Sequence, residues 1–455
     1  MAGADRQSLM VDFYELTMAA AYHHHGISQR ATFELFVRGL PPERSFLIAA
    51  GIESALDYLE TLRFTDDGIE FLRSQPGFRT VQSSFFDYLK TFRFTGEVHA
   101  VPEGTVVFAQ EPLLRVTAPI PEAQIVETYL LSVLHVETLI ASKAARVVEA
   151  ARGRKVLEFG TRRAHGPEAG VRAAKAAYLG GCSATSNVLA GQMYGVPLAG
   201  TAAHSWTMIF PSERESFERL LDVFPETAIL LIDTYDAREG AATAASLGRK
   251  VMGVRLDSGD LGNDSKQVRA LLDRRGLKDT KIIASGDLNE FKIKALLDEG
   301  APIDVFGVGT DLATSHDAPA LGMVYKLVET NEDGKAEFKA KFSDGKVNFP
   351  GRKQVFRFSR NGMFTHDVLA CDGESFPEAE PLLEPVLRGG KRLGPMPSMA
   401  ERRERVRTGL SKLPEIHKRL EPAEAYPVRP SPSLERRLEE LRERHISPLA
   451  GKSAR

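Results

Sequence analysis

Hydrophobic and polar positions follow two kinds of pattern along the chain. Residues 9–25 carry apolar side chains at helical spacing, and Gly26 suits the cap of a helix that ends there. Between residue 32 and about 128, strand-like apolar runs are mixed with helix-like stretches, which predicts an α+β domain. Residues 122–151 are rich in Leu, Val and Ala and predict a long helix.

A repeating pattern begins after this helix. Short apolar or β-branched runs return at intervals of roughly 20–40 residues, usually with helix-compatible stretches between them, which predicts successive βα units. Several runs, such as 229–232, are apolar on both faces, as a buried parallel sheet requires. This pattern alone fits both a (β/α) barrel and an open doubly wound sheet. The six runs are KVLEFGTRRAHG near residue 155, VPLAGTAAHS near 196, AILLIDTYDAREG near 228, KVMGVRLDSGDLG near 250, KIIASGDLNE near 281 and IDVFGVGTDL near 303.

The alternation ends after the sixth run. Residues 326–357 predict short strands with turns at 331–334 and 343–345, which we expect to pack back on the N-terminal domain. Residues 433–444 predict a surface helix, and 446–455 predict a frayed tail. The predicted domains are an N-terminal α+β domain at 1–130, a βα-repeat domain with the active site at 131–325, and C-terminal strands and helices at 326–455.

Composition narrows the class of protein. Hydrophobic residues make up 43% of the 455, enough for substantial cores, and 59 Lys and Arg balance 61 Asp and Glu. This balance gives no overall field that would attract nucleic acid or an acidic membrane surface. Cys182 and Cys371 are too few for a disulfide framework or a zinc set. With no signal-peptide pattern and no apolar run long enough to span a membrane, we expect a cytoplasmic protein.

Polar motifs stand where the predicted strands end, which is where active sites of α/β proteins are built. Arg162 and Arg163 follow the first strand and can clamp a carboxylate or phosphate, or form surface ion pairs. His204 stands among small residues, where a histidine can act as base, acid or nucleophile, or simply be a satisfied core residue.

Carboxylates and glycines follow the later strands. Carboxylates at these positions can hold sugar hydroxyls or hydrated Mg²⁺, and residues 307–310 resemble a backbone nest for a phosphate. Each motif is weak alone, but together at one sheet edge they indicate a ligand site. The four carboxylates are Asp233, Asp236, Asp257 and Asp260.

These motifs together resemble those of nicotinate phosphoribosyltransferases, members of the type II phosphoribosyltransferase group. The combination of GTAAHS with VRLDSGD is specific to that family, and the other matches add weight. The zinc-binding cysteine cluster of some longer relatives is missing. The matching segments run in the family's order over about residues 9–360: DFYELTM at 12–18, residues 33–38, EFGTRRAHG, GTAAHS, IDTYD, VRLDSGDL, FGVGTDL and PGRKQVFR at 350–357.

The resemblance implies an irregular (β/α) barrel beside a separate α+β domain, in a head-to-tail homodimer whose active sites form between subunits. It implies that nicotinate, 5-phosphoribosyl 1-pyrophosphate and ATP react with Mg²⁺ present. The products would be nicotinate mononucleotide, pyrophosphate, ADP and phosphate, in the first step of NAD salvage from nicotinate. Magnesium would arrive with the substrates rather than at a dedicated protein site.

The resemblance also implies residue roles at matching positions. His204 corresponds to the histidine that ATP phosphorylates, while Asp233 and Asp257 complete the catalytic set. Phe159 and Tyr14 of the partner subunit would sandwich the pyridine ring. The nicotinate-binding residues would be Tyr14, Phe159, Arg162, Ser186, Thr201 and Arg255, and the phosphoribosyl-binding residues Arg38, Arg255, Asp257, Gly286, Gly309 and Thr310.

Sister activities are the nearest alternatives. Relatives that use nicotinamide carry an aspartate where this chain has Ser186, and a hydroxyl can donate to the carboxylate of nicotinate. Quinolinate phosphoribosyltransferases share the broad fold but have no counterpart of His204. A barrel lyase or aldolase would usually place a lysine at a strand end, and no strand-end motif here has one. A binding protein without activity would not need a reactive histidine among Asp and Arg.

Overall fold

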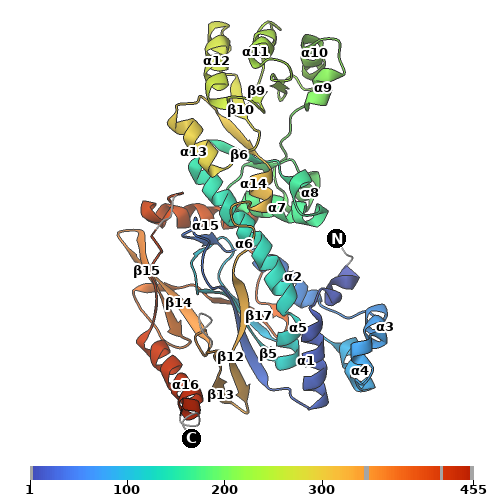
Figure 1. Ribbon diagram of the computed structural model, residues 1–455, viewed down its shortest axis with the longest axis vertical. Helices are drawn as coiled ribbons and strands as arrows, with labels where there is room; N and C mark the ends of the chain where they lie inside the picture. The colour runs from blue at the N-terminus through green and yellow to red at the C-terminus, as the bar shows by residue number, and fades with distance from the viewer. Residues whose placement is uncertain (1–3, 343–347, 421–423, 451–455) are drawn as a thin grey trace. The chain divides into compact units, whose positions relative to one another are not determined.

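The computed structural model describes residues 4–342, 348–420 and 424–450, with the backbone alone at 4–6 and 446–450. Contacts divide the chain into two compact units, described separately below: unit 1 is Met1–Thr138 with Ala320–Arg455, and unit 2 is Leu139–Pro319. Figure 1 labels their elements. Within the described residues, no helix has both the length and the apolar character needed to cross a membrane.

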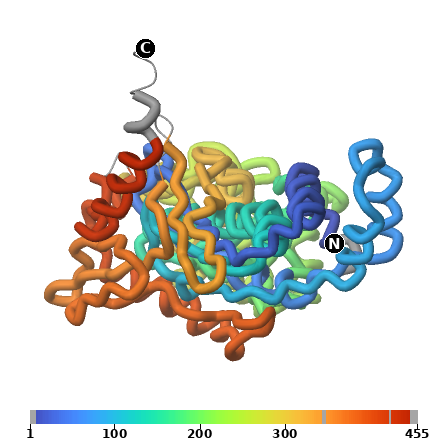
Figure 2. The backbone as a smooth tube through the Cα atoms, turned by 90° about the horizontal axis from the view of Figure 1, so that it is seen from below, coloured from blue at the N-terminus to red at the C-terminus, as the bar shows by residue number. Residues whose placement is uncertain are grey.

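Unit 1 is built on sheets that join distant parts of the sequence. In its seven-stranded antiparallel sheet, β1 (Arg30–Val37) pairs on one side with β5 (Pro112–Pro119) and on the other with β12 (Met323–Glu332). The blue N-terminal strand and the orange returning strand therefore lie side by side (Figure 2). The other strands of this sheet are β13 (Lys335–Phe338), β3 (Glu97–Ala100), β17 (Glu384–Arg388) and β18 (Lys391–Arg392).

A second sheet of unit 1 encloses a charged pair. The Nη2 atom of Arg357 lies 2.6 Å from Oδ2 of Asp367, and both side chains are at most 2% exposed. The guanidinium also lies 4.6 Å from the ring centroid of Phe364 and 5.3 Å from that of Phe108. The strands of this sheet are β16 (Ala379–Pro381), β14 (Lys353–Arg360), β15 (Met363–Cys371) and β19 (Val428–Pro430); β2 (Leu47–Ile48) and β4 (Val106–Val107) form a separate pair.

Most helices of unit 1 bury one face, whereas the short α5 is buried at every position. In α16, for example, Leu434 and Leu441 are buried while the charged positions between them are largely exposed. The α-helices are α1 (Phe13–His24), α2 (Ile52–Thr61), α3 (Asp66–Ser74), α4 (Ser83–Thr91), α5 (Ile120–Ile125), α15 (Met399–Lys412) and α16 (Pro432–Ala450), and the 3-10 helices are η1 (Ala4–Leu9), η2 (Pro76–Phe78) and η4 (Glu415–His417).

Unit 2 contains a curled sheet of six parallel strands that forms an open half-barrel. Its strands are short and almost wholly buried, as expected for a parallel sheet with helices on its outside. The predicted irregular barrel beside an α+β domain is thus confirmed. In spatial order the strands are β7 (Ala184–Thr185), β6 (Lys155–Glu158), β11 (Val305–Val308), β10 (Lys281–Ala284), β9 (Gly253–Leu256) and β8 (Ile229–Leu231).

Helices follow the strands of unit 2, and side chains at the strand ends cap several of them. Asp236 accepts hydrogen bonds from the backbone amides of Arg238 and Glu239, and Asp260 accepts one from Asn263. The helices are α6 (Glu127–Ala150, which begins in unit 1), η3 (Thr161–Arg163), α7 (Pro167–Leu179), α8 (Val188–Tyr194), α9 (His204–Met208), α10 (Glu213–Val223), α11 (Ala237–Ala245), α12 (Leu261–Arg274), α13 (Glu290–Asp298) and α14 (Thr310–Thr314).

One predicted strand is wrong. The run near residue 196 forms only an isolated bridge between Leu198 and Thr185, and the paired strand in this region is the two-residue β7. Beyond the bridge, residues 200–203 are small and leave the sheet. Their polar atoms instead accept hydrogen bonds from Arg255, through Thr201 Oγ1 and the carbonyl oxygen of Ala202.

The boundaries of the two units differ from the predicted domain boundaries, and no turn-forming segment marks the one at Thr138 in the sequence. The predicted boundary at 130/131 falls inside α6, and that at 325/326 falls inside β12, whereas contacts divide the chain at Thr138 and Ala320. The predicted turn at 331–334 joins β12 to β13, while that at 343–345 lies outside the described residues. The predicted helix at 433–444 continues to Ala450, into the segment expected to fray; 451–455 lie outside the described residues.

Candidate active site

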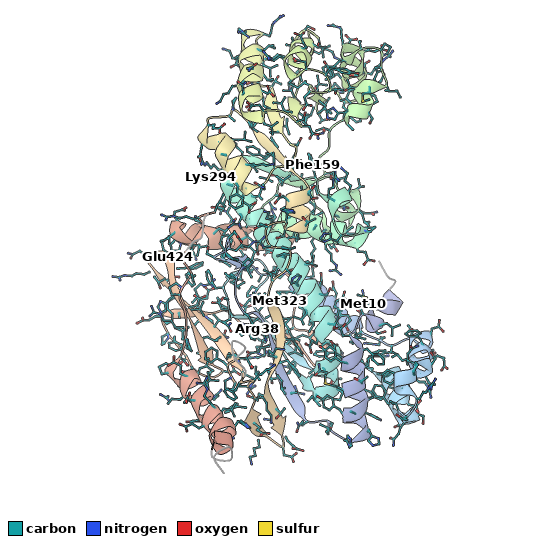
Figure 3. All side chains as sticks on the ribbon, viewed as in Figure 1. Met10, Arg38, Phe159, Lys294, Met323 and Glu424 are labelled. Atoms are coloured by element: carbon teal, nitrogen blue, oxygen red, sulfur yellow. The ribbon has the colours of Figure 1, made fainter. Side chains whose placement is uncertain are left out.

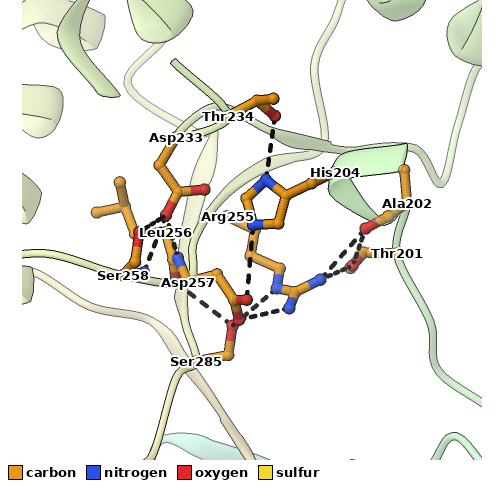
Figure 4. Close-up of polar contacts among 10 residues, drawn as sticks. All are labelled: Thr201, Ala202, His204, Asp233, Thr234, Arg255, Leu256, Asp257, Ser258 and Ser285. Carbon is orange, nitrogen blue, oxygen red and sulfur yellow. Dashed lines mark hydrogen bonds and ion pairs between the residues drawn. The ribbon is translucent and has the colours of Figure 1, made fainter. Parts of the chain in front are cut away.

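The carboxyl edge of the half-barrel gathers five of the predicted site residues into one polar network (Figure 4). Thr201 and His204 come from the segment before and at the start of α9, Asp233 follows β8, and Arg255 and Asp257 come from β9 and its end. Parallel strands present their carboxyl ends at the same edge, so residues far apart in sequence meet there.

Arg255 is the centre of this network. Its Nη1 donates to Thr201 Oγ1 at 2.6 Å and to the Ala202 carbonyl at 3.2 Å. Its Nε donates to Ser285 Oγ at 2.7 Å, and its Nη2 lies 2.5 Å from Asp257 Oδ1. The fork-shaped guanidinium is thus fixed from three sides, which holds its charge in one orientation.

Asp257 is held in its charged form. Burial alone would raise the pKa of this carboxyl. The hydrogen bond from Ser285 Oγ at 2.6 Å, together with the charges of Arg255 and His204, outweighs burial and lowers the pKa below its ordinary value. A carboxylate is therefore present at this edge even in mildly acidic solution.

His204 stands beside this carboxylate and remains accessible. Its Nδ1 lies 3.2 Å from Oγ1 of Thr234, and its Nε2 lies 3.8 Å from Oδ2 of Asp257. The side chain is 39% exposed. A histidine that served only to fill a core would be enclosed, so the geometry does not fit the core alternative.

Asp233 organises the loop after β9. Its Oδ2 accepts the backbone amide of Asp257 at 2.6 Å, and the amide and hydroxyl of Ser258 at 2.9 and 3.1 Å. Its other oxygen, Oδ1, is buried and has no hydrogen-bond partner among the described residues. Asp233 therefore has one oxygen fixed by the fold and one that is enclosed without a hydrogen-bond partner among the described residues.

Phe159 lies beside the network and packs against Gly307 of β11, where a larger residue would not fit. A Cβ at Gly307 would come within 2.7 Å of the Phe159 ring and 3.3 Å of Ser285 Cβ. Phe159 is half-buried and its amide donates to the carbonyl of Val308 (labelled in Figure 3). The ring thus packs on β11 and is available for stacking against a planar ligand.

The predicted phosphate-binding glycines lie in loops after β10 and β11. Gly286 has a φ of +96°, and a Cβ there would lie 2.0 Å from the carbonyl oxygen of Asp257. The loop can pass this close to the network only because residue 286 is glycine. Gly309 precedes α14, and the exposed Thr310 begins that helix.

Other predicted residues remain outside the network. The side chains of Arg162 and Ser186 are exposed, and Ser186 donates its backbone amide to the carbonyl of Glu158. Tyr14 and Arg38 belong to unit 1, on α1 and just after β1, so their roles stay predictions. Asp236 and Asp260 are helix caps in the described structure, and this structural role accounts for their place at the strand ends.

Sequence analysis missed several residues of the site. Ser285 contacts both Arg255 and Asp257, and Thr234 contacts His204. Thr234 follows the predicted Asp233 and Ser285 precedes the predicted Gly286, and this adjacency in the sequence could have pointed to both. Glu213, at the start of α10, gave no signal; burial and the charges of Asp233 and Asp236 raise its pKa to about 7.

A resident metal site is not evident from the side chains. Within the described part of the chain, no group of three or more His, Cys, Asp or Glu is arranged to hold a metal ion.

Comparison with known proteins defines the class of this fold first. The family model for the C-terminal domain of quinolinate phosphoribosyl transferase matches residues 140–323, which includes every strand of the half-barrel. Human nicotinic acid phosphoribosyltransferase has a similar structure, with a TM-score of 0.81 and 29% identity over 94% of this chain and 99% of that one. Unit 2 is therefore a phosphoribosyltransferase barrel.

The flanking regions and whole-chain relatives identify the family. The family models for the N-terminal and C-terminal domains of nicotinate phosphoribosyltransferase match residues 9–135 and 375–438. The chain is 44% identical to nicotinate phosphoribosyltransferase pncB2 of Mycobacterium tuberculosis over 96% of this chain and 94% of that protein. It is 38% identical to the nicotinate phosphoribosyltransferase of Bacillus subtilis, with 93% of each covered. The chain belongs to the nicotinate phosphoribosyltransferase family, and it is an enzyme of the transferase class.

Proposed function

We propose that this enzyme transfers the phosphoribosyl group of 5-phosphoribosyl 1-pyrophosphate to nicotinate, coupled to ATP, as the first step of NAD salvage from nicotinate. The observation that carries the proposal is the solvent-accessible cluster of His204, Arg255 and Asp257 at the carboxyl edge of the half-barrel. The family to which the chain belongs supports the choice of substrates.

Transfer requires positioning and charge stabilisation rather than a general base. The nucleophile is the pyridine nitrogen, which carries no proton that must be removed near neutral pH. The bond between ribose C1 and the pyrophosphate oxygen breaks with positive charge developing at C1, and the new bond forms from the ring nitrogen. Arg255 supports the departing negative charge, and the ionised Asp257 supports the positive charge of the sugar.

The nicotinate ring would lie against Phe159. Offset stacking of this kind contributes about 0.5–1.5 kcal/mol beyond the burial of area. We assign recognition of the ring carboxylate to Arg162, Ser186 and Thr201, with Arg255 nearby. The exposed side chains of Arg162 and Ser186 leave both free to turn toward a ligand. A second stacking surface would come from Tyr14 of the partner subunit.

The ribosyl substrate would occupy the adjacent loops. Gly286, Gly309 and Thr310 offer close backbone approach and a hydroxyl for its 5-phosphate. Arg38 is assigned a phosphate contact across the dimer. Mg²⁺ would enter with the phosphates, and the carboxylate of Asp233, which has one oxygen without a partner among the described residues, would help to hold it. The cation supplies charge neutralisation at the pyrophosphate.

His204 would couple the reaction to ATP. A ring nitrogen attacks the terminal phosphorus of ATP, the N–P bond forms and ADP leaves. Water later cleaves the N–P bond and releases phosphate, which pulls nucleotide synthesis forward. Phosphorylation places negative charge beside Asp233, where it can help to organise Mg²⁺ on the ribosyl substrate.

Two broader assignments accompany the proposal. The enzyme works as a homodimer with active sites shared between subunits, and it works in the cytoplasm. The dimer is testable by light scattering. A mixture of two impaired variants, Tyr14→Ala and His204→Ala, would regain part of the ATP-coupled activity if the sites are shared. Fractionation of cells that produce the protein tests its location.

Product formation from labelled nicotinate and 5-phosphoribosyl 1-pyrophosphate with Mg²⁺, with and without ATP, tests the activity directly. Parallel reactions with nicotinamide and quinolinate test its sister activities. Product from nicotinate alone, with matching ADP release, is the expected result. Product from nicotinamide or quinolinate instead would move the function to a sister enzyme.

The variant His204→Ala tests the coupling. We expect no phosphoenzyme from labelled ATP and no stimulation by ATP, while slow ATP-independent synthesis continues. Loss of one or two charge-assisted contacts predicts a fall of about tenfold to a hundredfold in kcat/KM under ATP. Undiminished ATP coupling in this variant would remove the proposed role of His204.

A further inference from the structure

One fully buried lysine of unit 2 has no part in the reaction proposed above. Lys143 lies on α6, its side chain is 0% exposed, and three carboxylates surround its ammonium group. Its Nζ lies 2.6 Å from Oε2 of Glu290, 2.8 Å from Oδ1 of Asp317 and 3.2 Å from Oδ1 of Asp311. Arg146, one turn further along α6, contacts the other oxygen of Glu290 at 3.1 Å.

Two of these carboxylates adjoin the loops assigned to the 5-phosphate. Glu290 is the first residue of α13 and follows the loop that contains Gly286. Asp311 directly follows Thr310 at the start of α14. Both helices are drawn beside α6 in Figure 1. A single ammonium group therefore joins the ends of two loops that follow neighbouring strands of the half-barrel.

A further contact links the two loops directly. Asn289 Nδ2 donates to Oδ2 of Asp311 at 3.4 Å, while Asn289 Oδ1 accepts the amide of Lys292 and caps α13. The long contact alone is weak. Lys143 supplies the stronger tie, because charge-assisted contacts in a buried setting resist displacement.

Charge gives this arrangement a second consequence. Carboxylates close to a phosphate-binding loop repel the phosphate that the loop must hold. Here the ammonium group of Lys143 lies between the carboxylates and offsets their charge from the interior. A lysine used only for stability would have no need to contact both loops.

We propose that Lys143 is a positioning residue for the phosphoribosyl substrate: through Glu290 and Asp311 it fixes the loops after β10 and β11 in the arrangement that binds the 5-phosphate. This inference rests on the proposed function for the identity of the ligand. It assigns to Lys143 no contact with substrate and no chemical step.

Direct binding of ribose 5-phosphate, measured by calorimetry without nicotinate or ATP, tests the proposal. In Lys143→Met we expect this affinity, and the KM for 5-phosphoribosyl 1-pyrophosphate, to weaken by about tenfold to a hundredfold, because a small displacement of binding groups has effects of this size. The KM for nicotinate should stay within about twofold, since Phe159 and Ser186 follow β6 and β7 and belong to neither of the loops that Lys143 would hold.

The variant Asp311→Asn separates positioning from charge and guards against misfolding. Its side chain is 22% exposed, so it disturbs the fold less than a change at Lys143. Removal of a negative charge near the phosphate would strengthen binding if charge alone mattered. If Lys143 acts by holding the loop, Asp311→Asn instead weakens ribose 5-phosphate binding by about threefold to tenfold.

Arg152→Met is the matched control. Arg152 follows α6 and pairs with Asp298 at the far end of α13, so this exposed pair joins the same two helices away from the loops. Its loss should change neither binding nor turnover. The control thus reports what a lost contact between α6 and α13 does in the absence of any tie to the phosphate loops.

The outcomes are distinct. Folded Lys143→Met with unchanged affinity for ribose 5-phosphate would overturn the proposal, as would tighter binding by Asp311→Asn. A wild-type enzyme that binds ribose 5-phosphate in a Lys143-dependent manner but makes no nucleotide would leave the positioning role intact and refute the proposed function alone. Equal losses in the KM of both substrates would indicate a general structural role and overturn the specific one.

Discussion

The same pair of residue types has opposite surroundings in the two units. In unit 1, Arg357 and Asp367 are at most 2% exposed, and aromatic rings cover the guanidinium. In unit 2, Arg255 and Asp257 are 13% and 29% exposed, and the accessible ring of His204 stands beside them. One pair is closed within a core, and the other is open at the edge of a half-barrel.

Hydrogen bonding also differs between the enclosed pair and the open edge. Arg357 donates from Nε and Nη2 to Asp367 and from Nη1 to the carbonyl of Val106, and Tyr426 donates to the same carboxylate. At the open edge, Asp233 keeps one oxygen without a partner among the described residues. Complete pairing with full burial indicates a structural role, whereas the unpaired oxygen of Asp233 and the accessible side chains of His204 and Asp257 are features that a ligand site can use.

Substitution of each arginine by methionine, which keeps length and removes charge, is the strongest way to break this comparison. Arg255→Met should lower kcat/KM by about 10²–10³-fold, as the loss of one preorganised donor does. Its free energy of unfolding should change by less than about 1 kcal/mol, since Asp257 remains 29% exposed and the buried Ser285 keeps its hydrogen bond to Asp257. Arg357→Met should instead lower the free energy of unfolding of unit 1 by about 3–5 kcal/mol, because it leaves Asp367 buried without its charge partner.

Denaturant unfolding and initial rates, measured on both variants at low temperature, check the two expectations. The folded fraction of Arg357→Met should retain a kcat/KM close to that of the wild type. A loss of activity without a loss of stability in Arg357→Met would mean that the enclosed pair has a functional role. A large loss of stability in Arg255→Met would erase the distinction between the two pairs.

Ser186→Asp sharpens the comparison at the open edge with a smaller effect. The side chain is exposed, so stability should stay within about 0.5 kcal/mol. A new carboxylate facing that of nicotinate should lower kcat/KM for nicotinate by roughly tenfold to a hundredfold, and that for nicotinamide far less. Competition between labelled nicotinate and nicotinamide measures the ratio.

Ser186→Asn is the matched control for that change. Asparagine has the size of aspartate without its charge, so it should reduce use of nicotinate only modestly. Similar losses for both bases in Ser186→Asp would show that residue 186 does not select the substrate. Similar behaviour of the Asp and Asn variants would assign the effect to size.

The sequence predicted the parts of this enzyme that depend on local pattern. Buried runs such as 229–232 and 281–284 became parallel strands, and the small-residue motif around His204 was correctly expected to lie at the carboxyl edge with Asp233 and Arg255. The run near 196 failed because its small residues pair with Arg255 rather than with a neighbouring strand.

Whether a polar residue has a structural or a ligand-binding role could not be predicted from the sequence. Asp236 and Asp260 were candidate ligands because they follow strands, but an aspartate at such a position serves equally well as a helix cap. Only the hydrogen bonds in the structure separate the two roles. The motif at 350–357 matched the family but carried no role. In the structure, Lys353 pairs with Glu34 and Arg357 pairs with Asp367, so this segment closes the core of unit 1. Burial decides whether such a residue has a structural or a ligand-binding role, and a short sequence motif does not indicate burial.

Glu213→Gln gives the smallest expected effect and the most direct test of incomplete pairing at the open edge. Burial, with Asp233 and Asp236 nearby, raises the pKa of Glu213 to about 7, above its ordinary value near 4.5. The protonated form therefore stabilises the fold below about pH 4.5, and this contribution is lost as the pH rises through about 7. Because the group is about half exposed, solvent screening reduces the effect to about 1 kcal/mol.

Without substrates, Glu213→Gln should thus be more stable than wild type at pH 8 and equal to it near pH 4.5. Thermal unfolding at both pH values measures the difference, and Glu218→Gln, an exposed change on the same helix, is the control. Removal of a carboxylate from the open edge then stabilises the protein, whereas removal of a partner from the enclosed pair destabilises it. If Glu213→Gln is destabilised at pH 8, the carboxylate of Glu213 must have a favourable partner, and the contrast with the enclosed pair of Arg357 and Asp367 would be lost.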